Sequence, residues 1–290
     1  MNLKLVFSYF VLLIITFAIA AVGFANGNPR RKHSLMGKFR FHKNFHSQFL
    51  PSDRDVIIYL PPGYERAKKK RYPVLYLHDG QNLFDGATSF IPGKEWRVDE
   101  TAQSLIRKRE IEPLIIVGIY NTGLSRVDEY TPTRDQKRNM GGKADLYGRL
   151  LVEELKPFID SEYRTLADAA NTGLGGSSLG GLATLYLGLK YADTFGKLAI
   201  ISPSLWWDNR FIVRGVEAMN VKHDVRIWLD MGTSEGTPMS DVRQLRDTLV
   251  SKGWLMDSDL KYFEAQGAVH DEAAWGNRVE MILRFLFPKK

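Results

Sequence analysis

The chain has 290 residues, of which 44% are hydrophobic and 25% are charged, and its formal net charge at pH 7 is +7. This length and composition are ordinary for a globular protein and suffice for one α/β domain with a full core. No cysteine is present, which excludes a disulfide framework, a thiolate metal site and a cysteine nucleophile. The basic runs at 30–32 and 68–71 lack interleaved aromatic residues, so no nucleic-acid partner is predicted.

The amino terminus has the pattern of a secretory signal peptide. Residues 1–25 place Lys4 before an apolar run and end in small residues before Asn26. Such a sequence predicts cleavage after Ala25 and export to the periplasm or the cell exterior. An uncleaved membrane anchor is the alternative, because the apolar run is nearly long enough to span a bilayer and the basic run that follows opposes export.

The rest of the chain has the pattern of one domain. Residues 26–36 are polar and basic, which predicts a flexible lead, and residues 37–290 are predicted to form the domain itself. No internal repeat divides this domain, and no integral membrane segment is predicted within it. Its first elements are two paired strands, expected at 37–50 and 55–60 and separated by a turn.

Buried strands and helices then begin to alternate. The apolar runs 74–77 and 114–119 are typical of strands that are covered on both faces of a parallel sheet. Asp99 is expected to cap a helix between them. Residues 121–142 form a polar connection longer than most loops, and such long connections tend to be functional. An amphipathic helix is expected from Asp145 onward.

The second half of the domain continues the alternation. Extended segments are predicted at 169–174, 198–201, 225–229 and 260–263, and helices are predicted after Ser178, from Ser240 and at the carboxyl terminus. This order predicts one doubly wound, mostly parallel sheet with an antiparallel amino-terminal edge.

Gly176-x-Ser178-x-Gly180 lies between a predicted strand and a predicted helix. This is the pattern of a nucleophile elbow, in which a sharp turn lifts a serine hydroxyl above the sheet. The glycines have a steric role, because a side chain at either position would collide with the neighbouring strand or helix. The five residues alone are weak evidence, since Gly and Ser are also common in ordinary loops.

A candidate acid and then a candidate base follow Ser178, and Ser, acid, His is the order that α/β hydrolases use. His270 lies in the loop before the last helix and is the candidate base. Two carboxylates compete to orient it: Asp230 ends the 225–229 strand, and Glu235 lies in the loop above it. Glu235 is favoured, because a longer side chain placed above the strand end can reach His270.

A developing oxyanion needs two backbone NH donors. The residue after the nucleophile, Leu179, is expected to supply one, and Gln81 in the loop after the 74–77 strand is expected to supply the other. Gly80 is expected to let this loop bend toward the substrate.

Two further residue pairs have more than one interpretation. Trp206 and Trp207 follow the 198–201 strand and are either core residues or a wall of the substrate site. His42 and His46 lie on one face of the first strand, but no third metal ligand lies near them in the sequence. No metal site and no cofactor are therefore predicted.

These motifs together carry a family resemblance. The chain resembles the putative esterase family of α/β hydrolases through the stretches 72–76, 79–85, Arg126 with 129–132, 176–181, 202–207, 232–235 and 270–275. That family includes enterobactin esterases, feruloyl and acetylxylan esterases, S-formylglutathione hydrolases and mycolyltransferases. The resemblance covers about residues 55–287 and implies the α/β-hydrolase fold. It also implies that Ser178 is the nucleophile, His270 the histidine and Glu235 the acid.

The sequence therefore predicts an exported serine carboxylic-ester hydrolase that works through an acyl-enzyme. The resemblance implies a small-molecule or glycan ester as substrate, in particular an ester of a siderophore or of a plant or bacterial polysaccharide. An acyltransferase with the same three residues and a catalytically inactive ligand-binding homologue are the alternatives. The oligomeric state is left open.

Overall fold

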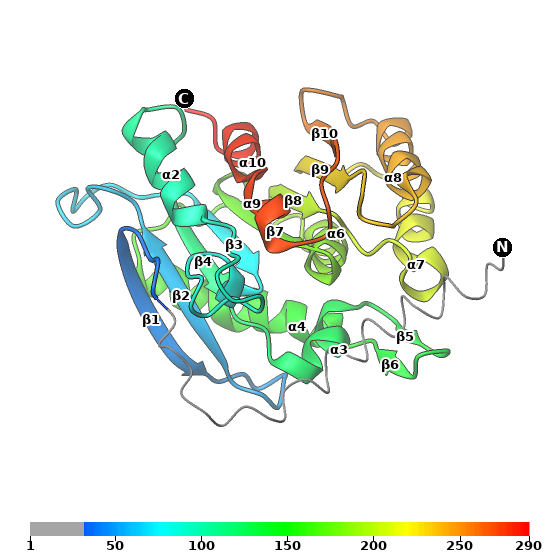
Figure 1. Cartoon of the computed structure of the whole chain (residues 1–290), viewed down its shortest axis with the longest axis horizontal. Helices are drawn as coiled ribbons and strands as arrows, with labels where there is room; N and C mark the ends of the chain where they lie inside the picture. Colours follow the sequence, from blue (N-terminus) through cyan, green and yellow to red (C-terminus); the bar gives the residue numbers. More distant parts are fainter. Residues whose placement is uncertain (1–31, 290) are drawn as a thin grey trace. The chain divides into compact units, whose positions relative to one another are not determined.

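One eight-stranded sheet forms the centre of the domain (Figure 1). The computed structural model describes residues 32–289, so the predicted signal peptide at 1–25 lies outside the described residues. In spatial order the strands are β1 (Lys38–Phe45), β2 (Arg54–Leu60), β4 (Ile115–Ile119), β3 (Val74–His78), β7 (Thr172–Ser177), β8 (Lys197–Ile201), β9 (Arg226–Gly232) and β10 (Leu260–Ala265).

The pairing of the strands confirms the predicted fold class. β1 pairs with β2, and β2 with β4, in antiparallel register. All other neighbours in this sheet are parallel, from β4 through to β10. β3 and β4 are buried along their whole length, as their continuous apolar runs predict.

Helices cover both faces of the sheet. Alternate strand residues point to opposite faces, so Leu75 packs toward one layer of helices and Tyr76 toward the other. The first layer contains α2 (Val98–Arg107), α9 (Glu272–Gly276) and α10 (Val279–Leu286). The second contains α4 (Ala144–Arg149), α5 (Lys156–Glu162), α6 (Leu179–Lys190), α7 (Trp207–Glu217) and α8 (Met239–Ser251).

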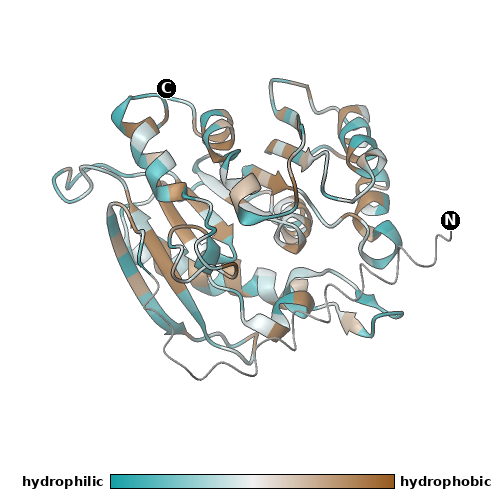
Figure 2. Cartoon of the chain, in the orientation of Figure 1, coloured by the Kyte–Doolittle hydropathy of each residue, from teal (hydrophilic) through white to brown (hydrophobic). Residues whose placement is uncertain are grey.

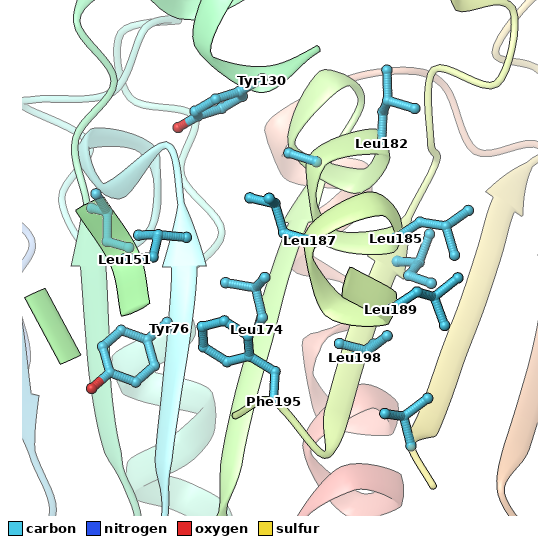
Figure 3. Close-up of a cluster of buried hydrophobic side chains, with 14 of the residues drawn as sticks. Tyr76, Tyr130, Leu151, Leu174, Leu182, Leu185, Leu187, Leu189, Phe195 and Leu198 are labelled. Carbon is cyan, nitrogen blue, oxygen red and sulfur yellow. The ribbon is translucent and has the colours of Figure 1, made fainter. Parts of the chain in front are cut away.

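The core follows from this layering. Figure 2 shows hydrophobic residues concentrated on the central strands and hydrophilic residues on the outer connections. In the larger cluster, α6 lies against the strands through Leu185 and Leu187, opposite Leu174 and Leu198 (Figure 3). Burying one such side chain contributes roughly 1.5–3 kcal/mol, so this layer fixes α6, and with it the turn that precedes α6.

Some boundaries differ from the sequence prediction. α2 begins at Val98, and Asp99 is not its cap, because the Asp99 carboxylate accepts a hydrogen bond from the Met36 backbone NH (2.6 Å). The long helix predicted from Asp145 contains a π-helical segment, Leu150–Leu155, between α4 and α5. α7 was not predicted.

The long polar connection contains short elements: η2 (Gly123–Ser125), α3 (Arg126–Tyr130), and the two-stranded pair β5 (Arg134–Asp135) and β6 (Met140–Gly141). The other short helices are η1 (Gly80–Asn82) and η4 (Ala169–Asn171). At the end of the predicted lead, His33 contacts the Asp85 carboxylate through Nδ1 (2.6 Å). Within residues 32–289, no helix is both long and apolar enough to cross a membrane.

Replacing Gly181 with alanine is expected to destabilise the domain. A Cβ at Gly181 would lie 2.8 Å from the Ile201 carbonyl oxygen and 3.1 Å from the Pro203 Cα, so α6 would have to move away from the end of β8. Overpacking of this kind costs about 1–3 kcal/mol of unfolding free energy, which chemical denaturation would measure.

Gly215 in α7 is the matched control, because nothing lies within 4 Å of an added Cβ there. Gly215→Ala is expected to raise the unfolding free energy by up to about 1 kcal/mol through helix propensity. Equal effects of the two substitutions would contradict the close approach of α6 to β8.

Candidate active site

The predicted site residues meet at the carboxyl ends of the parallel strands. Ser178 follows β7, Glu235 follows β9 and His270 follows β10. Because these strands are neighbours and parallel, their following loops lie at one edge of the sheet, where ligands gather in open α/β folds.

Ser178 has the backbone geometry of a nucleophile elbow. Its φ is 58° and its ψ is −122°, a conformation that a non-glycine residue rarely adopts. The turn is held by a hydrogen bond from the Ser178 NH to the Ile201 carbonyl (3.1 Å) and by close packing at Gly176. A Cβ on Gly176 would lie 2.9 Å from the His78 ring, which explains the glycine. The elbow presents the Ser178 side chain half-buried at the start of α6.

His270 bridges the other two predicted residues. Its Nε2 lies 2.9 Å from the Ser178 Oγ, and its Nδ1 lies 2.8 Å from the Glu235 Oε2. The Trp275 ring meets the imidazole edge-on, with 4.9 Å between the ring centroids. The structure thus brings Ser178, His270 and Glu235 into one hydrogen-bonded line.

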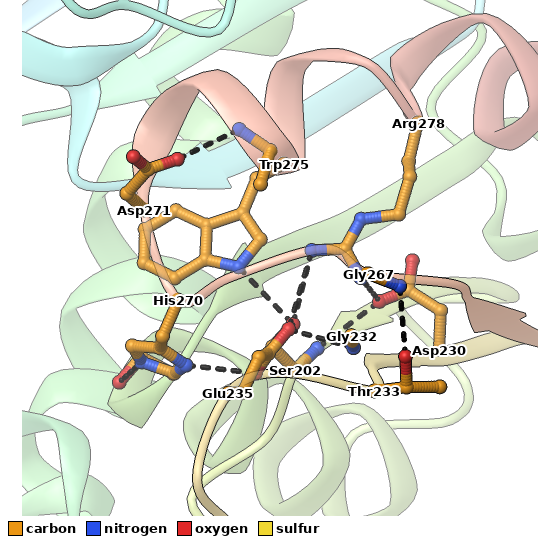
Figure 4. A network of polar contacts seen from close by, with 12 residues as sticks. Ser202, Asp230, Gly232, Thr233, Glu235, Gly267, His270, Asp271, Trp275 and Arg278 are labelled. Carbon is orange, nitrogen blue, oxygen red and sulfur yellow. Dashed lines mark hydrogen bonds and ion pairs between the residues drawn. The ribbon is translucent and has the colours of Figure 1, made fainter.

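The Glu235 carboxylate is buried and fully hydrogen-bonded (Figure 4). Its side chain is 0% exposed, and its Oε1 accepts hydrogen bonds from the Gly232 NH (2.7 Å) and the Ser202 Oγ (2.5 Å). Burial alone would raise the pKa of Glu235, but the hydrogen bonds from His270, Ser202 and Gly232 outweigh it and lower that pKa below its ordinary value. Glu235 is therefore an anion at neutral pH.

The rival acid, Asp230, faces other partners. It accepts hydrogen bonds from the Arg278 Nη1 (2.8 Å), the Trp228 Nε1 (2.7 Å) and the Ser202 NH (3.2 Å). Burial raises the pKa of Asp230 to about 6, although Arg278 acts in the opposite direction. In the part of the chain that the structure describes, His270 bonds to Glu235 and not to Asp230, so the geometry favours Glu235 as the acid.

The two predicted oxyanion donors lie at helix starts. Leu179 is the first residue of α6 and Gln81 the second of η1, so neither backbone NH has an acceptor within its own helix. The Gln81 segment is fixed from both sides. Its carbonyl accepts from the Thr88 Oγ1 (2.7 Å), and its side-chain Oε1 accepts from the Asn121 NH (3.3 Å).

Two predicted substrate contacts are more buried than the sequence suggests. Gly80 is buried, and a Cβ there would lie 2.5 Å from the Gly118 carbonyl carbon, so the glycine lets the loop pack closely on β4. Trp207 is only 2% exposed and donates through Nε1 to the Thr133 carbonyl (3.1 Å), which places it in the core. Trp206 is half-buried, and the Arg138 guanidinium lies over its ring, 4.9 Å from the centroid.

Sequence reasoning assigned no role to a second ion pair beside the site. The Asp79 carboxylate accepts two hydrogen bonds from Arg126 (2.7 Å each) and one from the Asn121 Nδ2 (2.7 Å). Burial would raise the pKa of Asp79, but Arg126 and Asn121 lower it below its ordinary value. The pair connects the Gln81 loop to α3 across 47 residues of chain, a separation for which the sequence offers no local signal.

The site is open to solvent. The His270 side chain is 37% exposed. A cavity of about 520 Å³ lies nearby between α2, α9 and α10, and Lys94, Trp96 and Gly276 are among its lining residues. Neither Ser178 nor His270 lines this cavity.

Comparison with known proteins decides the family. Residues 47–286 match the family described as "Putative esterase". The chain belongs to this esterase family. The match covers the whole site from Gln81 to His270 and, with the relatives described next, identifies the protein as a carboxylic ester hydrolase.

Two relatives of the esterase are named for different ester substrates. It is 28% identical to an endo-1,4-beta-xylanase/feruloyl esterase of Xylanibacter ruminicola, over 79% of this chain and 29% of that protein. It is 29% identical to the iron(III) salmochelin esterase of Escherichia coli O6:H1, over 70% of this chain and 47% of that one. The chain thus spans less than half the length of these two relatives.

A solved structure supports the fold. The esterase matches the crystal structure of the BES protein from Bacillus cereus with a TM-score of 0.66 and 21% sequence identity. The match covers 90% of this chain and 99% of that one, so the α/β-hydrolase architecture extends over nearly the whole length.

Asp79→Asn is expected to destabilise the esterase. Asparagine has the same shape and tolerates the left-handed backbone at this position (φ 57°), but it loses the charge that binds Arg126. Hydrogen bonds to charged groups contribute about 1.5–3 kcal/mol, so the unfolding free energy should fall by that amount.

Asp145→Asn is the control. The Asp145 carboxylate also binds a cation, Lys190, but its side chain is 56% exposed, and such pairs contribute less than about 1 kcal/mol. Denaturant titrations in which the Asp79 variant loses no more stability than the Asp145 variant would contradict the importance of the buried pair.

Proposed function

We propose that the protein is a serine esterase in which Ser178 is the nucleophile, His270 the general base and Glu235 the residue that orients His270. The observation that carries this proposal is the position of the imidazole, 2.9 Å from the Ser178 Oγ and 2.8 Å from the Glu235 Oε2. Nucleophile and base within hydrogen-bond reach, with the base oriented by a third group, is the arrangement that nucleophilic catalysis requires.

The reaction begins with proton transfer. As the Ser178 Oγ attacks the ester carbonyl carbon, the His270 Nε2 takes the hydroxyl proton. The carbonyl oxygen becomes an anion and accepts hydrogen bonds from the Leu179 and Gln81 NH groups. The tetrahedral intermediate then expels the alcohol, which takes its proton from His270. This step leaves the acyl group on Ser178.

Water completes the cycle. With His270 again acting as base, a water molecule attacks the acyl-enzyme and releases the acid. Each step passes through an imidazolium, and the buried Glu235 anion stabilises that charge. The lowered pKa of Glu235 keeps this anion available at neutral pH. Acyl products formed with added alcohols or glycans would reveal the acyltransferase alternative.

The substrate is proposed from the relatives and the surface. We assign an ester of a siderophore or of a polysaccharide, because the named relatives are a salmochelin esterase and a feruloyl esterase. The half-buried Trp206 is the candidate wall for an aromatic or glycan group.

Export to the periplasm or the exterior is proposed from the signal-like residues 1–25, with membrane tethering if that segment is not cleaved. The proposed mechanism requires no cofactor.

Ser178→Ala is expected to abolish ester hydrolysis. Removal of a serine nucleophile lowers kcat by about 10³-fold or more, because binding and the oxyanion donors alone remain. Turnover of p-nitrophenyl acetate, methyl ferulate, acetylated xylan and a catecholate trilactone by the chain from Asn26 onward would measure this. Ser161→Ala, at an exposed position of α5, is the control and should keep full activity. Hydrolysis by Ser178→Ala within a few fold of the unaltered enzyme would rule out the proposed mechanism, and failure of a fluorophosphonate to label Ser178 would favour the ligand-binding alternative.

Glu235→Gln tests whether Glu235 is the acid that orients His270. The amide cannot stabilise the imidazolium and favours the wrong histidine tautomer, so kcat is expected to fall by about 10²- to 10⁴-fold. Glu217→Gln is the control, because Glu217 is exposed on α7. An active Glu235→Gln variant beside an inactive Ser178→Ala variant would mean that Ser178 and His270 work without an acid.

A further inference from the structure

The Ser202 hydroxyl has three partners and only one proton. It lies 2.5 Å from the Glu235 Oε1, 3.1 Å from the Trp275 Nε1 and 3.1 Å from the Arg278 Nη2. Indole and guanidinium nitrogens only donate hydrogen bonds. The hydroxyl therefore accepts from Trp275 and Arg278, and its proton can go only to Glu235. Its two donors fix the direction of this hydrogen bond.

Arg278 connects two buried carboxylates. Its side chain is 2% exposed, and it donates from Nη1 to the Asp230 Oδ1 (2.8 Å) and from Nη2 to Ser202. The same Nη2 lies 3.6 Å from the Glu235 Oε1. Asp230 and Glu235 are both 0% exposed, so one guanidinium offsets the charge of two buried anions. Figure 4 shows Arg278 placed between them.

We propose that Ser202 and Arg278 are positioning residues that hold the Glu235 carboxylate as an anion with its Oε2 directed at His270, while Asp230 is the counter-ion that holds Arg278. This inference rests on the proposed function. Ser202 and the Gly232 NH occupy Oε1 of Glu235, which leaves Oε2 for the imidazole. The carboxylate is therefore held from the side opposite His270.

The network also predicts a change in pH dependence. The charged or titratable groups that face Glu235 are Asp230 in β9, His270 after β10 and Arg278 between α9 and α10. The Ser202 hydrogen bond lowers the pKa of Glu235, so its removal raises that pKa. Because the ionised form orients His270 and stabilises its imidazolium, a variant without the hydroxyl should have a pH–rate profile displaced from that of the unaltered enzyme.

Ser202→Gly is the variant of choice. Ser202 has a φ of 44°, in the region that favours glycine, so this substitution removes the hydroxyl and relieves backbone strain at the same time. A charge-assisted hydrogen bond of this kind corresponds to about ten- to a hundredfold in rate, and we expect kcat for p-nitrophenyl acetate to fall by that factor with KM unchanged. Ser202→Ala should have the same kinetic effect.

Arg278→Lys provides a second, independent test. Lysine keeps a positive charge beside Asp230 but cannot bind Asp230 and Ser202 together as the planar fork does. The matched control is Arg54→Lys, because Arg54 is equally buried and binds the Glu129 carboxylate away from Ser178 and His270. Both lysine variants should lose thermal stability, but only Arg278→Lys should lower kcat and move the pH profile.

A variant that combines Ser202→Gly with Glu235→Gln distinguishes a positioning role of Ser202 from a general loss of packing in the site. If Ser202 acts through Glu235, then Ser202→Gly should have little further effect on kcat in a Glu235→Gln background. Unchanged kcat and pH profiles in folded Ser202→Gly or Arg278→Lys would overturn the inference, and so would fully additive losses in the double variant. If one of these two single variants failed to fold, the kcat and pH profile of the other would test the inference. Absence of Ser178-dependent turnover in the unaltered chain would instead refute the proposed function.

Discussion

The backbone strain at Ser178 is the constraint on which the rest of the site depends. A residue with a φ of 58° costs free energy, and only firm packing on both sides keeps it in that conformation. The packing comes from α6 against the sheet, from Gly176 against His78 and from Gly181 against the end of β8. These contacts together place the Ser178 hydroxyl at the edge of the sheet where the loops after β9 and β10 also lie.

Two carboxylates at this edge differ because their surroundings differ. Asp230 and Glu235 are both buried, yet the pKa of Asp230 is raised by burial whereas the pKa of Glu235 is lowered by its hydrogen bonds. Asp230 accepts a hydrogen bond from the charged Arg278 guanidinium, and Glu235 accepts hydrogen bonds from the neutral Ser202 and Gly232 donors and from His270. Burial thus dominates the pKa of Asp230, the structural anion, whereas hydrogen bonds dominate the pKa of Glu235, the proposed catalytic anion.

Much of the fold could be predicted, because buried parallel strands are continuous apolar runs and the helices between them are periodic. Ser178, Glu235 and His270 could be predicted because each follows such a strand. Arg278 could not, since one arginine in a helical region gives no sign of its partners, Ser202 after β8 and Asp230 in β9. α7 was not predicted, and its residues 208–210 have positive φ. The burial of Gly80 and Trp207 depends on Gly118 and Thr133, which are distant in sequence.

The contacts of the His270 ring have a consequence for its freedom of motion. The imidazole is bounded by Ser178 on one nitrogen, by Glu235 on the other and by the perpendicular ring of Trp275. Asp271 begins α9 immediately after it by accepting a hydrogen bond from the Ala274 NH (2.9 Å). Although solvent reaches the ring, few rotamers remain open to it. The entropy of ordering the base is therefore lost when the chain folds and not in each encounter with an ester.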